Sequence, residues 1–232
     1  CYLRIIVKGS LVFFKCPTMN VLCAEGMEYN GLHLDIILWA IVCNAPARAM
    51  IKSVKYFSGY FGCDRCEIKG DYCNNKVTFQ QIDAPLRTDS SFRQRRQPAH
   101  HQLAPSPLEL LEIDMVSTFP IDYMHSVCLG VMRKMLFVWT KGSYGLQVHK
   151  LSASQRLEIS DRLVKLRPNI PDCFARKPRG LDDLERWKAT ELRQFLLYTG
   201  RHVLQDVLTE RHYNHFLTLS VAMSILLAPV LT

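Results

Sequence analysis

No stretch of the sequence is long and apolar enough to cross a lipid bilayer, which takes about 20 residues. The two best candidates fail, because Leu34–Cys43 contains Asp35 and Leu217–Leu231 is short and broken by Pro229. The first residues lack an initiator Met and the basic and apolar layout of a signal peptide. We therefore expect no membrane partner, and we interpret the chain as beginning inside a longer protein.

The sequence also lacks the paired cysteines of a small secreted domain. Its 232 residues include nine Cys, an odd number, and most stand singly among apolar residues. In a chain without a signal peptide, this pattern favours a reducing compartment, where single cysteines act as small core residues. Cys63 and Cys66 are the exception.

The charge balance is moderately basic. The chain has 29 Lys and Arg against 21 Asp and Glu, a net charge of +8, and 48% of its residues are hydrophobic. That hydrophobic share is ordinary for a globular protein. A basic balance favours acidic partners, of which nucleic acid comes first and an anionic membrane second.

Residues 1–56 have the pattern of a β-rich core. Leu32–Cys43 is a continuous apolar run, typical of a strand buried on both faces. Tyr2–Val7 and Leu11–Phe14 are shorter candidate strands, and Met19–Met27 is a candidate helix. A buried strand beside a helix predicts an α/β core.

Residues 57–107 are rich in Gly, Cys, Asn, Gln, Pro and Arg, and their apolar periodicity fades. This stretch is too long for an ordinary connection, so it is either an insertion held by something other than a core or a disordered segment. Four arginines make it locally basic and are candidate contacts to nucleic-acid phosphates: Arg87, Arg93, Arg95 and Arg96. A solvated, partly disordered loop is the alternative interpretation.

Residues 108–232 are predicted to be mainly helical. Met124–Trp139 has a period near 3.6, and Ser152–Leu166 begins with a capping box formed by Ser152 and Gln155. Leu181–Tyr198 is expected to be one helix with Gly200 near its end, and Tyr213–Leu227 a final apolar helix.

Cys63 and Cys66 form a CxxC pair, whose spacing lets two thiolates bind one tetrahedral Zn²⁺. Gly62 before it permits a tight turn. We expect zinc, with the remaining ligands among Cys73, His100, His101 and His125. Two alternatives stay open, namely unrelated core cysteines and a redox pair.

Two further groups of residues have the chemistry of metal or proton transfer. Asp122 and His125 are three positions apart, so they share one face of a helix. Residue pattern alone favours a helix-capping Asp and a core His for this pair. Glu191 is the other candidate, and a solvated helix carboxylate is its ordinary interpretation.

Taken together, these motifs resemble the animal relatives of the En/Spm (CACTA) DNA transposases, from about residue 28 to the end of the chain. The resemblance is carried, in order, by APAR, GYFGCDRC, DAPLRTDSSF, HH, STFPIDYMHSVCLGVMRKML and RKPRGLDDLERWKATELRQFLLYTG. It implies an RNase H-like mixed sheet with flanking helices, interrupted by the Cys/His-containing insertion and followed by a helical part. It also implies cleavage and strand transfer of DNA by two Mg²⁺ ions held on three carboxylates.

Carried over residue by residue, the resemblance predicts a degenerate catalytic site. The family's second catalytic Asp falls on Asn44, and its final acidic residue matches Glu191. Its first Asp is expected upstream of the first residue. Its DxxH and CxxC motifs match Asp122 and His125, and Cys63 and Cys66. Phe57 stands where a His is usual.

The resemblance therefore implies a decayed or domesticated transposase segment that keeps the fold and an affinity for DNA. It also implies that the protein acts in the nucleus. Mg²⁺ prefers anionic oxygen, so an amide at Asn44 weakens its binding. Two alternatives stay open: a nuclease completed by an upstream region, and a zinc-stabilised protein-interaction module with no nucleic-acid role. The sequence does not fix the oligomeric state.

Overall fold

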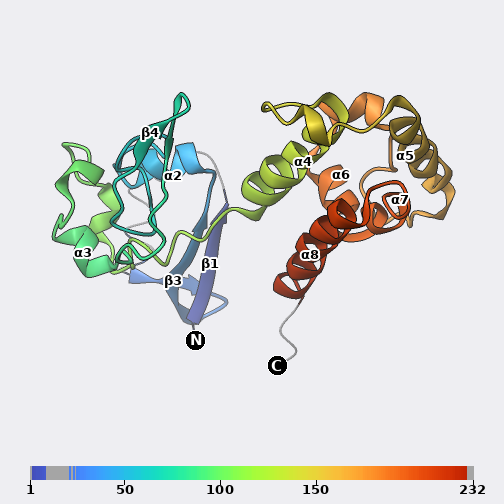
Figure 1. Ribbon diagram of the computed structural model, residues 1–232. Helices are drawn as coiled ribbons and strands as arrows, with labels where there is room; N and C mark the ends of the chain where they lie inside the picture. Colours follow the sequence, from blue (N-terminus) through green and yellow to red (C-terminus); the bar gives the residue numbers. More distant parts are fainter. Residues whose placement is uncertain (1, 9–20, 22, 24, 229–232) are drawn as a thin grey trace. The chain divides into compact units, whose positions relative to one another are not determined.

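The computed structural model describes residues 2–8, 21, 23 and 25–228, and its fold is mixed α/β (Figure 1). The chain divides into two compact units, Cys1–Asp122 and Tyr123–Thr232. The boundaries expected after residues 56 and 107 both fall inside the first unit. The described elements of that unit are β1 (Tyr2–Lys8), β2 (Met27–Tyr29), β3 (Leu32–Val42), α2 (Ala45–Ile51), β4 (Asp71–Cys73), β5 (Lys76–Thr78), α3 (Asp89–Arg93), η2 (Pro98–His100) and η3 (Pro107–Leu110).

The larger sheet of the first unit is mixed, and β3 is its central strand, as its apolar run predicts. β1 pairs parallel with β3 on one side, and β2 pairs antiparallel with it on the other. The prediction that both faces of β3 are buried is wrong, because Leu38 is 5% exposed whereas its neighbour Trp39 is 56% exposed. The face that carries Leu38 packs on the core, and the face that carries Trp39 is open to solvent. Leu11–Phe14 and part of Met19–Met27 lie outside the described residues.

The loop-rich residues 57–107 belong to the core of the first unit. They hold the β4–β5 hairpin and the short helix α3, whose Phe92 is fully buried with Ile41, Met115 and Phe119. The Ile41 N–H also donates to the Thr118 carbonyl at 2.8 Å. The segment that follows the insertion therefore runs beside the end of β3.

The second unit is helical throughout its described elements. α5 begins as predicted, since Ser152 Oγ accepts the Gln155 N–H at 3.2 Å and Gln155 Oε1 accepts the Ser152 N–H at 3.0 Å. Its elements are η4 (Met124–Met132), α4 (Arg133–Lys141), η5 (Gln147–His149), α5 (Ala153–Lys165), η6 (Arg167–Asn169), η7 (Leu181–Arg186), α6 (Ala189–Gln194), η8 (Phe195–Thr199), α7 (Gly200–Val203) and α8 (Glu210–Leu226).

The single helix expected over Leu181–Tyr198 is wrong. The 3₁₀-helix η7 ends before Trp187, whose extended backbone (ψ 132°) breaks the run, and the π-helix η8 follows α6. Gly200 does not end a helix either. A Cβ at Gly200 would lie 2.5 Å from the Phe195 carbonyl oxygen and 2.6 Å from the Phe216 ring, so the position is reserved for close packing of α8.

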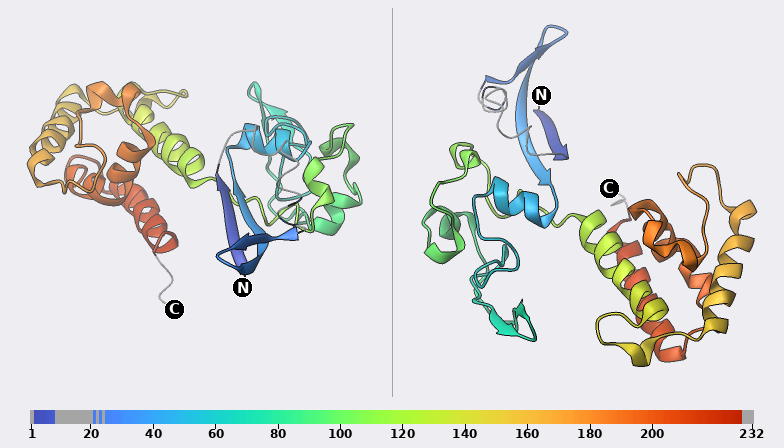
Figure 2. Two further views of the ribbon diagram at one scale, coloured as in Figure 1. Left: turned by 180° about the vertical axis from the view of Figure 1, so that it is seen from behind. Right: turned by 90° about the horizontal axis from the view of Figure 1, so that it is seen from above.

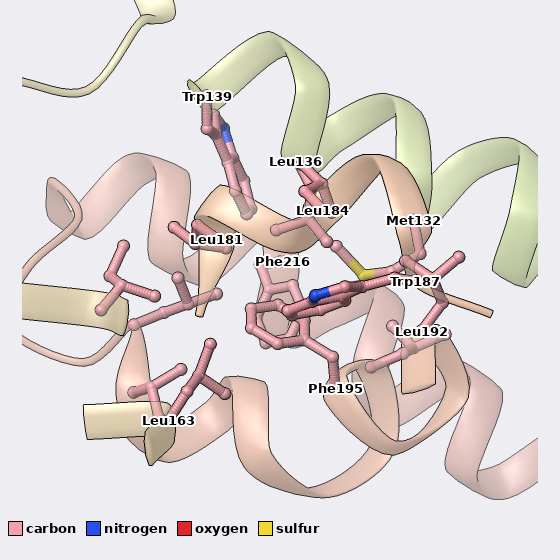
Figure 3. Packing of buried hydrophobic residues seen from close by; sticks show 14 of the residues in the cluster. Met132, Leu136, Trp139, Leu163, Leu181, Leu184, Trp187, Leu192, Phe195 and Phe216 are labelled. Atoms are coloured by element: carbon pink, nitrogen blue, oxygen red, sulfur yellow. The ribbon is translucent and has the colours of Figure 1, made fainter. Parts of the chain in front are cut away.

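Aromatic side chains fill the core of the second unit (Figure 3). The Phe195 ring lies 5.7 Å from Trp187 and 6.0 Å from Phe216, centroid to centroid. Met132 and Leu136, from η4 and α4, pack against the same group. η7, α6, η8 and α8 are thus held around one apolar centre, which fixes the position of Glu191 on α6.

Candidate functional site

The blue strand β3 leads into the helix α2 (Figure 2). Asn44 is the second residue after β3 and stands directly before α2. Its backbone is extended (φ −65°, ψ 164°), and its Oδ1 accepts the Ala47 N–H at 2.9 Å, so it is the N-cap of α2. Asp and Asn cap helices about equally well. The fold therefore does not require the amide at this position, and a carboxylate would fit the same geometry.

Two carboxylates lie near the end of β3. Burial raises the pKa of the Cys43 thiol, Arg48 opposes this shift, and the charges of Asp122 and Asp64 add to it. Asp64 is neutralised locally, because Arg48 Nε lies 3.2 Å from its Oδ2 and Lys52 pairs with its Oδ1.

Lys52 is completely buried, which is rare for an ammonium group. Its Nζ pairs with Asp64 and lies 5.1 Å and 5.2 Å from the ring centroids of Phe92 and Phe119. Burial lowers the pKa of Lys52 and the Asp64 carboxylate opposes that shift. Since Asp64 stands between Cys63 and Cys66, this ion pair anchors the CxxC turn to α2.

The CxxC turn brings its two thiols together. Cys63 Sγ and Cys66 Sγ are 3.1 Å apart, which confirms the predicted approach within about 4 Å. Arg65, the other residue inside the turn, donates to the carbonyls of Val116 and Phe119. Gly62 is needed for close packing, because a Cβ there would lie 2.3 Å from the Tyr56 carbonyl oxygen.

The two neighbouring histidines present different nitrogens. His100 Nδ1 lies 2.6 Å from the Phe61 carbonyl, which can only accept, so Nδ1 carries the proton and Nε2 has a free lone pair. His101 Nδ1 lies 3.0 Å from Arg95 Nη1, which can only donate, so its Nε2 carries the proton. Both rings are neutral, because burial lowers the pKa of each to about 4. Only His100 is therefore in the tautomer that binds a metal through Nε2.

Buried polar atoms without a hydrogen-bond partner gather around the CxxC turn. Arg87 Nη2 donates to the Cys66 carbonyl at 3.1 Å, whereas its Nε and Nη1 have no partner, and His100 Nε2 and His101 Nε2 have none. Such groups are uncommon in native proteins and often mark a missing ion or water. However, no three His, Cys, Asp or Glu side chains among the described residues are grouped closely enough to hold a metal ion as they stand.

The four arginines of the insertion mostly hold the fold together. Arg87 is buried, Arg93 pairs with Asp89 and donates to three backbone carbonyls, and Arg95 pairs with both oxygens of Glu109. Of the four, Arg96 has the most exposed side chain, 61% accessible and 3.9 Å from Glu67. Phosphate contact by this set stays a prediction, and Arg96 is the member best placed for it.

Glu191 is buried, and both of its oxygens are engaged. Arg179 Nε donates to Oε1 at 2.7 Å, and Oε2 accepts from Arg179 Nη2 at 3.0 Å and from the Lys188 N–H at 2.8 Å. Burial raises the pKa of Glu191, but these hydrogen bonds outweigh it and leave the pKa below its ordinary value. Glu191 thus stays ionised and fully partnered inside the second unit.

Of the DxxH motif, His125 lies in an unusual helix, and Asp122 precedes that helix. His125 lies in η4, a π-helix, and η8 immediately follows the helix that carries Glu191. π-Helices are rare and occur often at functional sites. Asn44 belongs to the first unit and Glu191 to the second, so the expected cleft between them stays a prediction, as does an approach of His125 to the cysteines.

A cavity of about 1240 Å³ in the first unit runs along β3 and the segment between Leu110 and Pro120. Its carboxylates are Asp35, Glu112 and Asp114. Asp114 already accepts the backbone N–H groups of Val116 and Ser117 at 2.7 and 2.8 Å. The motif residues Asn44 and Asp122 do not line this cavity.

The chain matches no protein-family model, no curated protein and no solved structure. Among the described helices, none has both the length and the apolar character that a membrane crossing needs.

Proposed function

We propose that the chain is part of a transposase-derived protein with an RNase H-like core that binds DNA and does not cut it. The observation that carries this proposal is the position of Asn44. It is the second residue after the central strand of a mixed sheet, next to Cys43, on which the charge of Asp122 acts. That is where the resemblance to En/Spm (CACTA) transposases expects a catalytic carboxylate. The ordered motifs from APAR to the final helices support the same assignment.

The lack of activity follows from the state of the carboxylates. Asn44 offers a metal only a neutral oxygen, and Mg²⁺ is bound mainly by anionic oxygen. Glu191 already accepts three hydrogen bonds, two of them from a guanidinium. To bind a metal it would have to give up a buried ion pair, which is costly. The residues present therefore do not fit a two-metal centre, and no cleavage step is assigned to them.

Zinc is the cofactor that the first unit fits best. Two thiols 3.1 Å apart and the buried lone pair of His100 Nε2 are ligands of the kind that zinc prefers. The hydrogen bond from His100 Nδ1 to the Phe61 carbonyl is typical of zinc-binding histidines. Two sulfurs on one zinc lie about 3.8 Å apart for bonds of about 2.3 Å, so the thiols would separate slightly on binding. Zinc would then brace the turn that Lys52 and Asp64 anchor.

DNA is the partner that charge and resemblance favour, and a protein derived from a DNA transposase acts in the nucleus.

A second candidate is a zinc-stabilised protein-interaction module, favoured by one observation. Arg87, Arg93 and Arg95 form hydrogen bonds and ion pairs within the first unit, so their guanidinium groups are not free to bind phosphates.

The affinity of the full chain for DNA at several salt concentrations separates these two candidates. DNA binding releases counterions, so the logarithm of the affinity should fall linearly with the logarithm of the salt concentration. A chain without affinity for duplex or single-stranded DNA at 50 mM salt would exclude the first candidate and leave the second.

A further inference from the structure

The positive charge of the chain is concentrated in the second unit. Residues 123–232 contain 16 Lys and Arg against nine Asp and Glu, a net charge of +7, whereas residues 1–122 contain 13 against 12. The insertion expected to bind DNA belongs to the nearly neutral unit. If the proposed function holds, the surface that binds nucleic acid should therefore be sought in the second unit.

Some cations of the second unit are neutralised by a neighbouring carboxylate, whereas Arg193 is not. Lys141, Arg162 and Lys177 pair with carboxylates, and Arg179 pairs with Glu191. Arg193 lies exposed on α6, and no ion pair among the described residues involves it. Its guanidinium is thus available to a phosphate, to which it can donate two parallel hydrogen bonds.

The π-helix η8 exposes an aromatic ring on the same helical stretch as Arg193. α6 runs directly into η8, and of residues 191–200 only Arg193 and Tyr198 are exposed. Both side chains act on the pKa of Tyr123, Arg193 lowering it and Tyr198 raising it, against a larger rise from burial. This shared effect on Tyr123 agrees with the exposure of both side chains on one helical stretch.

Tyr198 has the geometry of a stacking platform. Its side chain is 51% exposed, although it stands in a helix whose other residues are buried. The Phe174 ring meets it edge-on, with centroids 5.3 Å apart and planes at 83°, and supports it from one side. A large aromatic ring held by a neighbour and open to solvent is what single-stranded nucleic-acid sites use to stack a base.

We propose that Arg193 and Tyr198 form a nucleic-acid contact on the second unit, the 193/198 face. Arg193 binds a backbone phosphate, and Tyr198 stacks on an unpaired base. The partner is single-stranded DNA or a duplex with a locally opened base pair, because a base inside an intact duplex offers no free face to a ring.

The test uses the full chain, a fluorescent single-stranded oligonucleotide and its matched duplex, with affinity measured by anisotropy across a range of salt. Tyr198→Ala should weaken single-strand binding by about tenfold and leave duplex binding nearly unchanged, since base stacking contributes roughly 1–3 kcal/mol. Tyr198→Phe should keep the affinity. Arg193→Ala should weaken both partners and reduce the salt slope by about one.

Matched controls come from the first unit. Tyr72→Ala removes a tyrosine that is 61% exposed on β4, and Lys76→Ala removes an exposed lysine on β5. Neither should change affinity or salt slope, and circular dichroism should show all variants folded.

Two outcomes would refute the proposed contact at the 193/198 face while leaving DNA binding intact. In the first, the Arg193 and Tyr198 variants bind DNA as well as the unaltered chain does. In the second, only a further variant, Arg96→Ala, weakens binding. If the unaltered chain binds neither oligonucleotide, the proposed function fails, and this inference fails with it. If Tyr198→Phe loses as much affinity as Tyr198→Ala, stacking is excluded.

Discussion

Replacement of Arg179 by Met tests whether Glu191 is a structural residue. The change keeps the apolar stem of the side chain and removes the cation that donates to both Glu191 oxygens at 2.7 and 3.0 Å. The carboxylate then stays in a buried site, since its side chain is only 3% exposed. Loss of one partner of a buried ion pair costs about 3–5 kcal/mol. Because the Arg179 side chain is 26% exposed, we expect the lower end of that range.

Urea unfolding followed by tryptophan fluorescence measures this loss, because Trp139 and Trp187 are both in the core of the second unit. The matched control is Arg186→Met, which breaks a surface pair of 3.7 Å whose arginine is 81% exposed. Exposed pairs contribute about 0–1 kcal/mol, so the control should unfold almost as the unaltered chain does. Equal stability of the two variants would refute the structural role of the Arg179–Glu191 pair.

The pH dependence of the unfolding free energy tests the Arg179–Glu191 pair independently. The pKa of Glu191 in the folded chain is below its ordinary value, despite the opposing effect of burial, because Arg179 and the Lys188 N–H stabilise the carboxylate. The pair therefore contributes stability above the unfolded pKa of about 4.3 and loses it as the pH falls through the folded pKa. In Arg179→Met, burial without the cation should raise the pKa of Glu191. Acidification from neutral pH should then stabilise the variant relative to the unaltered chain.

Three further changes test the packing and the metal. Asp64→Asn leaves the buried ammonium of Lys52 without its carboxylate and should lower the unfolding free energy by about 3 kcal/mol. The control Asp71→Asn, on the exposed β4, should lower it hardly at all. Similar values for the two variants would mean that Lys52 is not held by this pair. The purified chain should contain about one zinc ion, which is lost in Cys63→Ser and kept in the control Cys173→Ser, whose cysteine is exposed. An unaltered chain that is free of metal and has normal stability would exclude the zinc site. Gly200→Ala should destabilise the chain by about 1–3 kcal/mol, despite the better helix propensity of Ala, because its Cβ would lie 2.5 Å from a carbonyl oxygen; a gain in thermal stability would contradict the packing.

Local features were predictable from the sequence because they depend on residues near one another. The capping box of Ser152 and Gln155 spans one helical turn, and the thiols of Cys63 and Cys66 meet because two residues separate them. The long apolar run of β3 identified the central strand for the same reason.

Features that depend on tertiary partners were not predictable. Lys52 looks like any helical lysine until its pairing with Asp64 is known, and Arg87 looks like a phosphate contact until it is found buried beneath the cysteines. The π-helix η8 and the break at Trp187 were not predicted either, and both residues of the Trp187–Phe195 ring pair lie in the core of the second unit. The missing carboxylate at Asn44 was visible in the sequence, but the engagement of Glu191 by Arg179 was not.

DNA binding without DNA cleavage is the central claim, and one gel experiment tests both halves. A labelled duplex and a labelled single strand are incubated with the full chain and Mg²⁺ or Mn²⁺, and each mixture is resolved on a native and on a denaturing gel. The account predicts retarded bands on the native gel and intact strands on the denaturing gel. Absence of retardation at low salt would contradict the DNA-binding function. Metal-dependent strand breaks that disappear in Glu191→Gln would contradict the claim of inactivity.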